Sequence, residues 1–249
     1  MNEDYYLFAA LALVCEVIGT VSGFGSSILF VPVASLFFDF KTVLGITAVF
    51  HVFSNLSKIA LFRKGINRNV AYKLGIPAVI FVILGAWLTT FLPSGEIELL
   101  MNIILVLLAA YLIFNFNKTL KQTDANLYMG GTASGLLAGL VGTGGAIRGL
   151  TLAAFNLPKE VFIATSAIID LGVDFSRAVV YVGYGYFKNE YLVLIPFLIG
   201  ISILGSYIGK LILKRTSEKV FRYIVLSVIV ATSIFQAVKY FTTGSNSAA

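Results

Sequence analysis

Charged side chains inside long apolar stretches are the residues of this sequence best placed to do chemistry. Arg148 lies three positions after Gly145 within an apolar run, where a charge is costly unless it faces a cavity or a partner. Beside a helix N-terminus, its guanidinium would suit a planar or tetrahedral oxyanion through forked hydrogen bonds as well as charge. A structural ion pair with Asp170 or Asp174 is the alternative.

Asp170, Asp174 and Arg177 are spaced four and three residues apart, so they share one face of a predicted helix. The two carboxylates could bind a cation or shuttle protons, or they could simply neutralise Arg148 and Arg177. His51 is the only histidine, and its unperturbed titration lies near neutral pH. It is a candidate carrier of a coupled proton, with a satisfied packing residue as the alternative.

Three further charges belong to this set. Glu16 is isolated in the first apolar window and is a candidate for proton coupling, or else a hydrogen-bonded packing residue. Lys58 and Arg177 lie nearer the predicted window ends. Both are expected to extend toward the membrane interface.

An enzyme is the competing class, because His51 with Asp170 and Asp174 could supply an acid, a base or metal ligands. The chain has no HExxH pair, no GxSxG elbow and no second histidine. Its single cysteine, Cys15, excludes a disulfide framework within one chain. We therefore expect no catalytic residues, no metal site, no cofactor and no enzymatic activity.

Two glycine clusters interrupt apolar stretches. In hydrocarbon, a broken helix persists only where it packs in protein or lines a wet cavity. The helix that follows each break would present free amides and a positive dipole end to an anion. Close helix packing by small residues is the alternative. The predicted substrate-binding residues are Gly23, Gly25, Ser26, Ser27, Asn55, Gly142, Thr143, Gly144, Gly145 and Arg148.

The composition indicates that these residues lie in a membrane. Hydrophobic residues make up 58% of the 249 positions and charged residues 12%, which is too little polar surface for a water-soluble globule. The net charge of +6 comes from short clusters at window ends, so nucleic acid is not an expected partner. No cleavable signal peptide is expected. Windows long enough to cross a bilayer are 5–22, 42–62, 70–92, 97–116, 125–141, 161–182, 190–212 and 219–241.

A fixed offset of 119 residues relates the two halves of the chain. It superimposes Gly23 on Gly142, Gly25 on Gly144, Ala48 on Ala167 and Pro77 on Pro196. The same offset pairs scarce polar residues, namely His51 with Asp170, Asn55 with Asp174 and Lys58 with Arg177. We interpret this as a duplication, with repeats at 1–118 and 119–243 and a flexible tail at 244–249.

The charge pattern predicts that the two repeats are inverted, because lysine and arginine concentrate in cytoplasmic loops. The first repeat has a basic loop at 63–73 and an acidic loop at 93–98, whereas the second is basic at 214–219. Inversion needs an odd number of crossings per repeat or a segment that returns to its starting side. We expect an all-α polytopic fold in which each repeat has a glycine-broken helical hairpin plus three transmembrane helices, with the N-terminus outside.

The glycine-rich turn, the apolar helix bearing Val31 and Pro32, its repeat at 138–150 and the following Ala164, Thr165 and Ser166 resemble the TauE/SafE sulfite exporter family, the TSUP anion permeases. The resemblance covers nearly the whole chain. It implies export of sulfite or a small organosulfonate such as sulfoacetate, driven by an ion gradient. Two features depart from the family pattern: serine at 26 and 27 where more glycine is expected, and arginine at 148.

We therefore expect a secondary transporter of the bacterial plasma membrane that works by alternating access, with an anion channel of the same fold as the alternative. The expected partners are a small anionic substrate, the lipid bilayer, a coupling proton or cation, and a second copy of the chain in a homo-oligomer. Since only the second break has an arginine beside it, the substrate should lie toward the C-terminal half.

Overall fold

The computed structural model describes residues 3–23, 25–62, 65–114 and 121–217, and the single positions 220, 223, 227, 234 and 238. All regular elements in these ranges are helical. They are α1 (Glu3–Ser22), α2 (Ser27–Ala34), α3 (Phe40–Leu61), α4 (Arg68–Leu88), η1 (Thr89–Phe91), α5 (Ser94–Phe114), α6 (Asp124–Val141), α7 (Gly145–Ala153), α8 (Lys159–Gly183), η2 (Asn189–Val193) and α9 (Leu194–Lys214). Of the expected helix at 219–241 the structure describes only the five single positions, all of them helical. The repeat boundary at 118 and the tail at 244–249 lie outside the described residues.

Three long helices begin at side-chain caps. The carboxylate of Asp39 accepts a hydrogen bond from the amide of Thr42 at the start of α3, and Asn67 caps α4 through the amide of Val70. Thr123 caps α6 in the same way. Each cap satisfies an amide that has no partner within its helix, so loop residues set where these helices begin.

Both predicted glycine breaks are present. Gly23 and Gly25 between α1 and α2, and Gly142 between α6 and α7, have φ values of +73°, +81° and +79°, in the left-handed region that favours glycine. The helices that follow have 8 and 9 residues. At 1.5 Å per residue they extend only about 12–14 Å, which is too short to cross a hydrocarbon core of about 30 Å. The short helix after each glycine break, α2 or α7, therefore spans only part of the membrane thickness.

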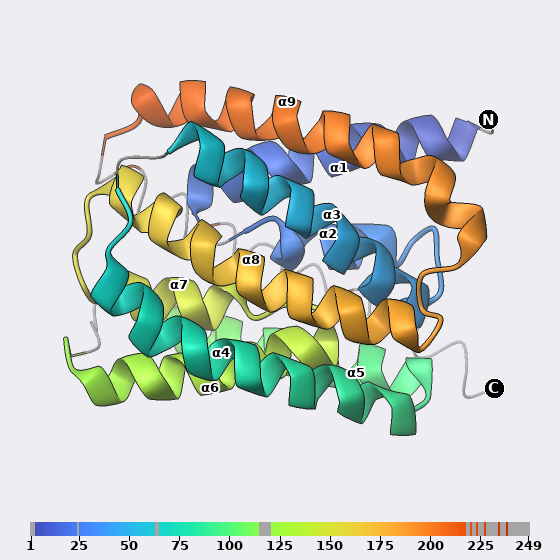
Figure 1. The fold of residues 1–249 in the computed structure, drawn as a ribbon, viewed down its shortest axis with the longest axis horizontal. Coiled ribbons are helices and arrows are strands. Elements are labelled where there is room, and N and C mark those ends of the chain that lie inside the picture. Colours follow the sequence, from blue (N-terminus) through green and yellow to red (C-terminus); the bar gives the residue numbers. More distant parts are fainter. Residues whose placement is uncertain are drawn as a thin grey trace.

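Most long helices of the first half of the chain pack against a long helix of the second half. The long central helices α3 and α8 pack against each other, α4 packs on α6, and α1 packs on α9, with α2 and α7 enclosed between them. Following the colours in Figure 1, α3 runs from right to left and α8 from left to right, and α4 and α9 also run in opposite directions. At the offset of 119 residues, α1, α2, α3 and α4 correspond to α6, α7, α8 and α9.

Glycine spacing brings α6 into backbone contact with α4. Gly131, Gly135 and Gly139 recur every fourth residue, and a Cβ at any of them would lie 2.2–2.3 Å from a backbone carbonyl oxygen of α4. Small residues at this spacing let membrane helices approach closely. Close packing of this kind also occurs at the glycine breaks, where a Cβ at Gly144 would lie 1.9 Å from the carbonyl oxygen of Ser134.

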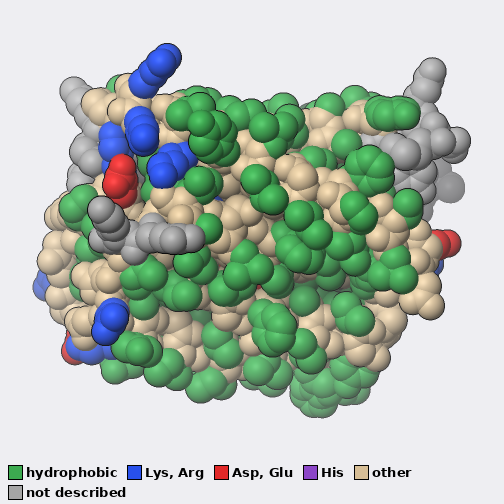
Figure 2. All heavy atoms as spheres, turned by 45° about the horizontal axis from the view of Figure 1, so that its top comes forward, with side chains coloured by type: hydrophobic (Ala, Val, Ile, Leu, Met, Phe, Trp, Pro, Cys, Tyr) green, Lys and Arg blue, Asp and Glu red, His purple; other side chains and the backbone are tan. Residues whose placement is uncertain are grey.

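Three of the described helical segments are long and apolar enough to cross a membrane by length and composition: 40–61, 68–91 and 189–214. The helix α8 is long enough, with 25 residues, but it carries Asp170, Asp174 and Arg177. Figure 2 shows hydrophobic side chains across the middle of the molecule and lysine and arginine gathered at its left end. Exposed basic residues at that end, such as Arg68, Lys214 and Arg215, border a surface suited to lipid.

Candidate functional site

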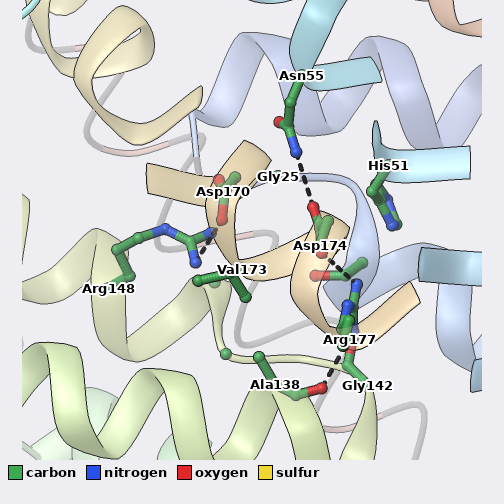
Figure 3. A pocket seen from close by; sticks show the side chains of 13 residues that line it. Gly25, His51, Asn55, Ala138, Gly142, Arg148, Asp170, Val173, Asp174 and Arg177 are labelled. Atoms are coloured by element: carbon green, nitrogen blue, oxygen red, sulfur yellow. Dashed lines mark hydrogen bonds and ion pairs between the residues drawn. The ribbon is translucent and has the colours of Figure 1, made fainter. Parts of the chain in front are cut away.

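The two glycine breaks meet at one buried pocket between the halves of the chain (Figure 3). Its walls come from both breaks, from the middle of α3 and from the charged face of α8, and they surround a narrow cavity of about 10 Å³, which is room for one water molecule. The lining residues are Gly25, Ser27, His51, Asn55, Ala138, Gly142, Gly144, Gly145, Arg148, Asp170, Val173, Asp174 and Arg177. The structure thus brings most of the predicted site residues together.

Arg148 is buried, with 3% of its surface exposed, and it pairs with Asp170. Its Nη1 lies 2.5 Å from Oδ1 of that carboxylate. Ser166 bridges the pair: its hydroxyl accepts from Arg148 Nε at 3.3 Å and donates to Asp170 Oδ2 at 3.2 Å. A Cβ at Gly25, on the first break, would lie 3.8–3.9 Å from both charged groups, so this ion pair stands between the two breaks.

The second ion pair holds the second break in place. Arg177 Nη2 lies 2.7 Å from Asp174 Oδ1, while its Nη1 donates to the carbonyl oxygens of Gly142 at 2.7 Å and Ala138 at 3.1 Å. These carbonyls end α6 and lack helical partners of their own. Asn55 Nδ2 donates to the other oxygen of Asp174 at 2.7 Å. Arg177 therefore has a structural role in addition to lining the pocket.

The prediction that Lys58 and Arg177 extend to the membrane interface is wrong. They are 4% and 1% exposed, and each pairs with a buried carboxylate, Glu16 or Asp174. Burial is tolerated because both charges are compensated and hydrogen-bonded.

Glu16 lies at the centre of a second buried network beside the pocket. Its Oε1 lies 3.0 Å from Lys58 Nζ. Four hydroxyls also donate to the carboxylate at 2.6–3.2 Å: those of Thr20, Ser26, Ser54 and Ser206. The carboxylate of Glu16 is therefore paired with the Lys58 ammonium and also hydrogen-bonded by four hydroxyls.

Ser26 links this network to His51. Its Oγ lies 2.6 Å from Glu16 Oε2 and 2.7 Å from His51 Nε2. Ser26 was predicted to bind substrate, but in this structure it contacts these two side chains, whereas the neighbouring Ser27 lines the pocket. The hydroxyl of Thr143 is buried and finds no hydrogen-bond partner among the described residues.

A second narrow cavity, also of about 10 Å³, adjoins the pocket. Gly23 and Lys58 line it, which places the remaining glycine of the first break here. Gly25, Asn55 and Asp170 line both cavities, so these three residues form the boundary between them.

Sequence reasoning missed the hydroxyl groups that surround the carboxylates. Thr20 and Ser54 each lie four residues from a charged partner on the same helix, Glu16 and Lys58 respectively, a spacing that could have identified them. Ser206 lies 190 residues from Glu16. No local pattern could have revealed that contact.

Helices broken at a buried polar site in the middle of the protein are characteristic of secondary membrane transporters. The family described as sulfite exporter TauE/SafE matches residues 7–235. The chain belongs to that family, as its sequence motifs predicted, and it is an integral membrane protein of an anion-exporter class. No curated protein and no solved structure gives a significant match.

Proposed function

We propose that this protein is a secondary transporter that exports a small sulfur-containing anion, sulfite or an organosulfonate such as sulfoacetate. The observation that carries the proposal is the buried guanidinium of Arg148, placed where both broken helices meet. Its forked donors match the oxygens of a sulfite or sulfonate group.

The short helices support an anion at this position. The first residues of α2 and α7, Ser27 and Gly145, both line the pocket. The amides at a helix N-terminus lack intrahelical partners and favour negative charge. Together with the guanidinium of Arg148, they would supply donors to an oxyanion.

We further propose that residues 1–118 and 119–243 form inverted repeats that move against each other in alternating access. Two observations support the inversion. Asn55 and Asp174, which are equivalent at the offset of 119, contact each other, as residues beside a two-fold axis must. A Cβ at Gly23 would contact Ile163, and one at the equivalent Gly142 would contact Leu44, the counterpart of Ile163; such reciprocal contacts are typical of two-fold symmetry.

The proposed orientation places the basic end of the molecule in the cytoplasm and the N-terminus outside, in a bacterial plasma membrane. This follows the excess of lysine and arginine where α4 begins and α9 ends. A cysteine at exposed position 217, in a chain whose Cys15 is replaced by alanine, should react with an impermeant maleimide only after cells are opened. Labelling in intact cells would contradict this orientation.

Coupling to an ion gradient is part of the proposal, with a proton or another cation as the coupled species. The candidate carriers are Glu16, His51, Asp170 and Asp174, all of which are buried in or beside the pocket. Intramembrane ionisable groups of this kind mark ion and proton pathways.

Reconstitution into liposomes tests the function. The wild type should move sulfite or sulfoacetate, and Arg148→Ala should abolish that flux because the anion loses its main charged ligand. Arg68→Ala, which removes an exposed arginine at the start of α4, is the matched control and should transport normally. Normal flux through a folded Arg148→Ala protein would refute the site.

A channel of the same fold is the alternative function. A coupled transporter and a channel differ in whether an imposed ion gradient can accumulate the anion inside liposomes against its own concentration gradient. Accumulation requires a coupled transporter, whereas a channel only equilibrates the anion. An enzyme remains a minor alternative, since the family is one of exporters.

A further inference from the structure

The charges that line the pocket already balance. Arg148 and Arg177 face Asp170 and Asp174, and all four side chains are buried. An anion that entered this site would add an uncompensated negative charge to a region poor in water. Such a charge is strongly unfavourable in a protein interior, so binding of the anion requires a compensating change.

We infer that the substrate anion and the carboxylate of Asp170 compete for Arg148, and that Asp170 takes up a proton when the anion binds. This inference rests on the proposed transport of a sulfur oxyanion. The proton comes from water and joins a carboxylate oxygen, and the anion replaces that carboxylate on the guanidinium. No covalent bond to the substrate forms or breaks. The net charge of the site changes by the charge of the anion plus the one positive charge of the proton.

Asp170 suits this role because little besides Arg148 holds it in place. Its other hydrogen bond comes from the hydroxyl of Ser166, and a serine hydroxyl can also accept a hydrogen bond. A protonated Asp170 could therefore keep Ser166 as a partner by reversing the direction of that bond. Its position at the boundary of both cavities gives it access to protons outside the anion pocket.

Asp174 is the poorer candidate. Its partner Arg177 also holds the carbonyl oxygens of Gly142 and Ala138, and Asn55 donates to its second oxygen. Loss of its charge would disturb the second glycine break.

The other charged or titratable groups facing the two cavities have partners of their own. Lys58 on α3 pairs with Glu16 on α1. His51 bonds to Ser26 through Nε2, while its Nδ1 is buried without a hydrogen-bond partner among the described residues. Protonation of Asp170 therefore makes the positive charge of Arg148 available to the anion.

The consequence is that one proton accompanies each anion in the same direction. A monoanion would then cross without net charge, and the membrane potential would neither help nor oppose it, whereas a dianion such as sulfoacetate would still carry one negative charge. Export would run down the gradient of the anion and carry a proton outward, so an inward proton gradient would oppose export and would not drive it.

Calorimetric titration of the full-length protein in detergent tests the proton directly. Sulfoacetate is a suitable probe because both of its acid groups stay ionised between about pH 6.5 and 8, far above ordinary carboxyl values. Comparison of buffers with different ionisation enthalpies should give one proton taken up per anion bound. The affinity should then fall about tenfold for each unit of rising pH, as one linked proton requires.

Asp170→Asn should bind sulfoacetate more tightly, with no proton uptake and no dependence on pH. Asp124→Asn, at an exposed pair with Lys73, is the matched control and should behave as the wild type does. Binding by the wild type without proton uptake would overturn the inference, even if Asp170→Asn failed to fold. Proton uptake that persisted in Asp170→Asn would overturn it as well.

Two outcomes separate this inference from the proposed function. If the wild type binds none of sulfite, sulfoacetate, sulfate or taurine, the proposed function itself fails. If it binds only taurine, whose own ammonium would compensate its sulfonate, the site takes zwitterions, and competition with Asp170 is refuted.

Discussion

Replacement of Glu16 by glutamine should destabilise the protein strongly, because it leaves the Lys58 ammonium buried without a counter-ion. Lys58 is 4% exposed, and after this change only neutral acceptors remain: the hydroxyl of Ser54, 2.7 Å from Nζ, and the amide oxygen at position 16. Removing one partner of a buried ion pair costs about 3–5 kcal/mol. We expect the free energy of unfolding to fall by about that amount in Glu16→Gln.

The reverse replacement should cost less. In Lys58→Met the carboxylate of Glu16 keeps the four hydroxyl donors that surround it. Hydrogen bonds to a charged group are worth about 1.5–3 kcal/mol each, so the carboxylate stays well compensated. We expect a loss of about 1–2 kcal/mol, and the double variant should lose less than the sum of the two single losses.

Unfolding in mixed micelles with increasing SDS would measure these free energies. The single tryptophan, Trp87, provides an intrinsic fluorescence signal near the end of α4. Equal losses in the two single variants, or additive losses in the double variant, would show that Lys58 does not depend on Glu16 for its compensation.

Three glycine replacements give further tests. Gly135→Ala should lose about 1–3 kcal/mol in the same unfolding assay, because its Cβ would lie 2.2 Å from a carbonyl oxygen of α4. Gly200→Ala, with no atom within 4 Å of the new Cβ, should be neutral or gain up to about 1 kcal/mol from helix propensity. Gly25→Ala has room beside Arg148 and Asp170 but strains a φ of +81°. We expect it to raise the KM for sulfoacetate about tenfold, on the usual scale for one methyl group in a pocket, and an unchanged KM in liposome flux would contradict a substrate path along the first break.

The positions of the helix breaks were predictable because their cause is local. Gly23, Gly25 and Gly142 adopt left-handed backbone conformations that side chains disfavour, and the surrounding apolar residues placed these turns inside a membrane. The convergence of the breaks was only suggested by the repeat. Their contact depends on how α3 and α8 pack against each other, which no single segment encodes.

The partners of the buried charges were not predictable in the same way. The sequence left Arg148 with two interpretations, and the structure pairs it with Asp170 through a shared contact to Ser166. Lys58 and Arg177 were expected at the interface because they lie near the ends of apolar windows. Their burial depends on Glu16 and on the carbonyl oxygens that end α6, and those groups come from other helices.

Residue types and spacing alone determined that this chain is a helical membrane protein of the sulfite exporter family, with charges that must face inward. Only the tertiary structure decided which charge meets which, because a buried charge accepts any partner that compensates it and the candidates are distributed over α1, α3, α7 and α8. The ion pair between Arg148 and Asp170 is one of the contacts that only the tertiary structure decided. It is a contact between helices, and it makes the predicted anion ligand and its competitor parts of one site.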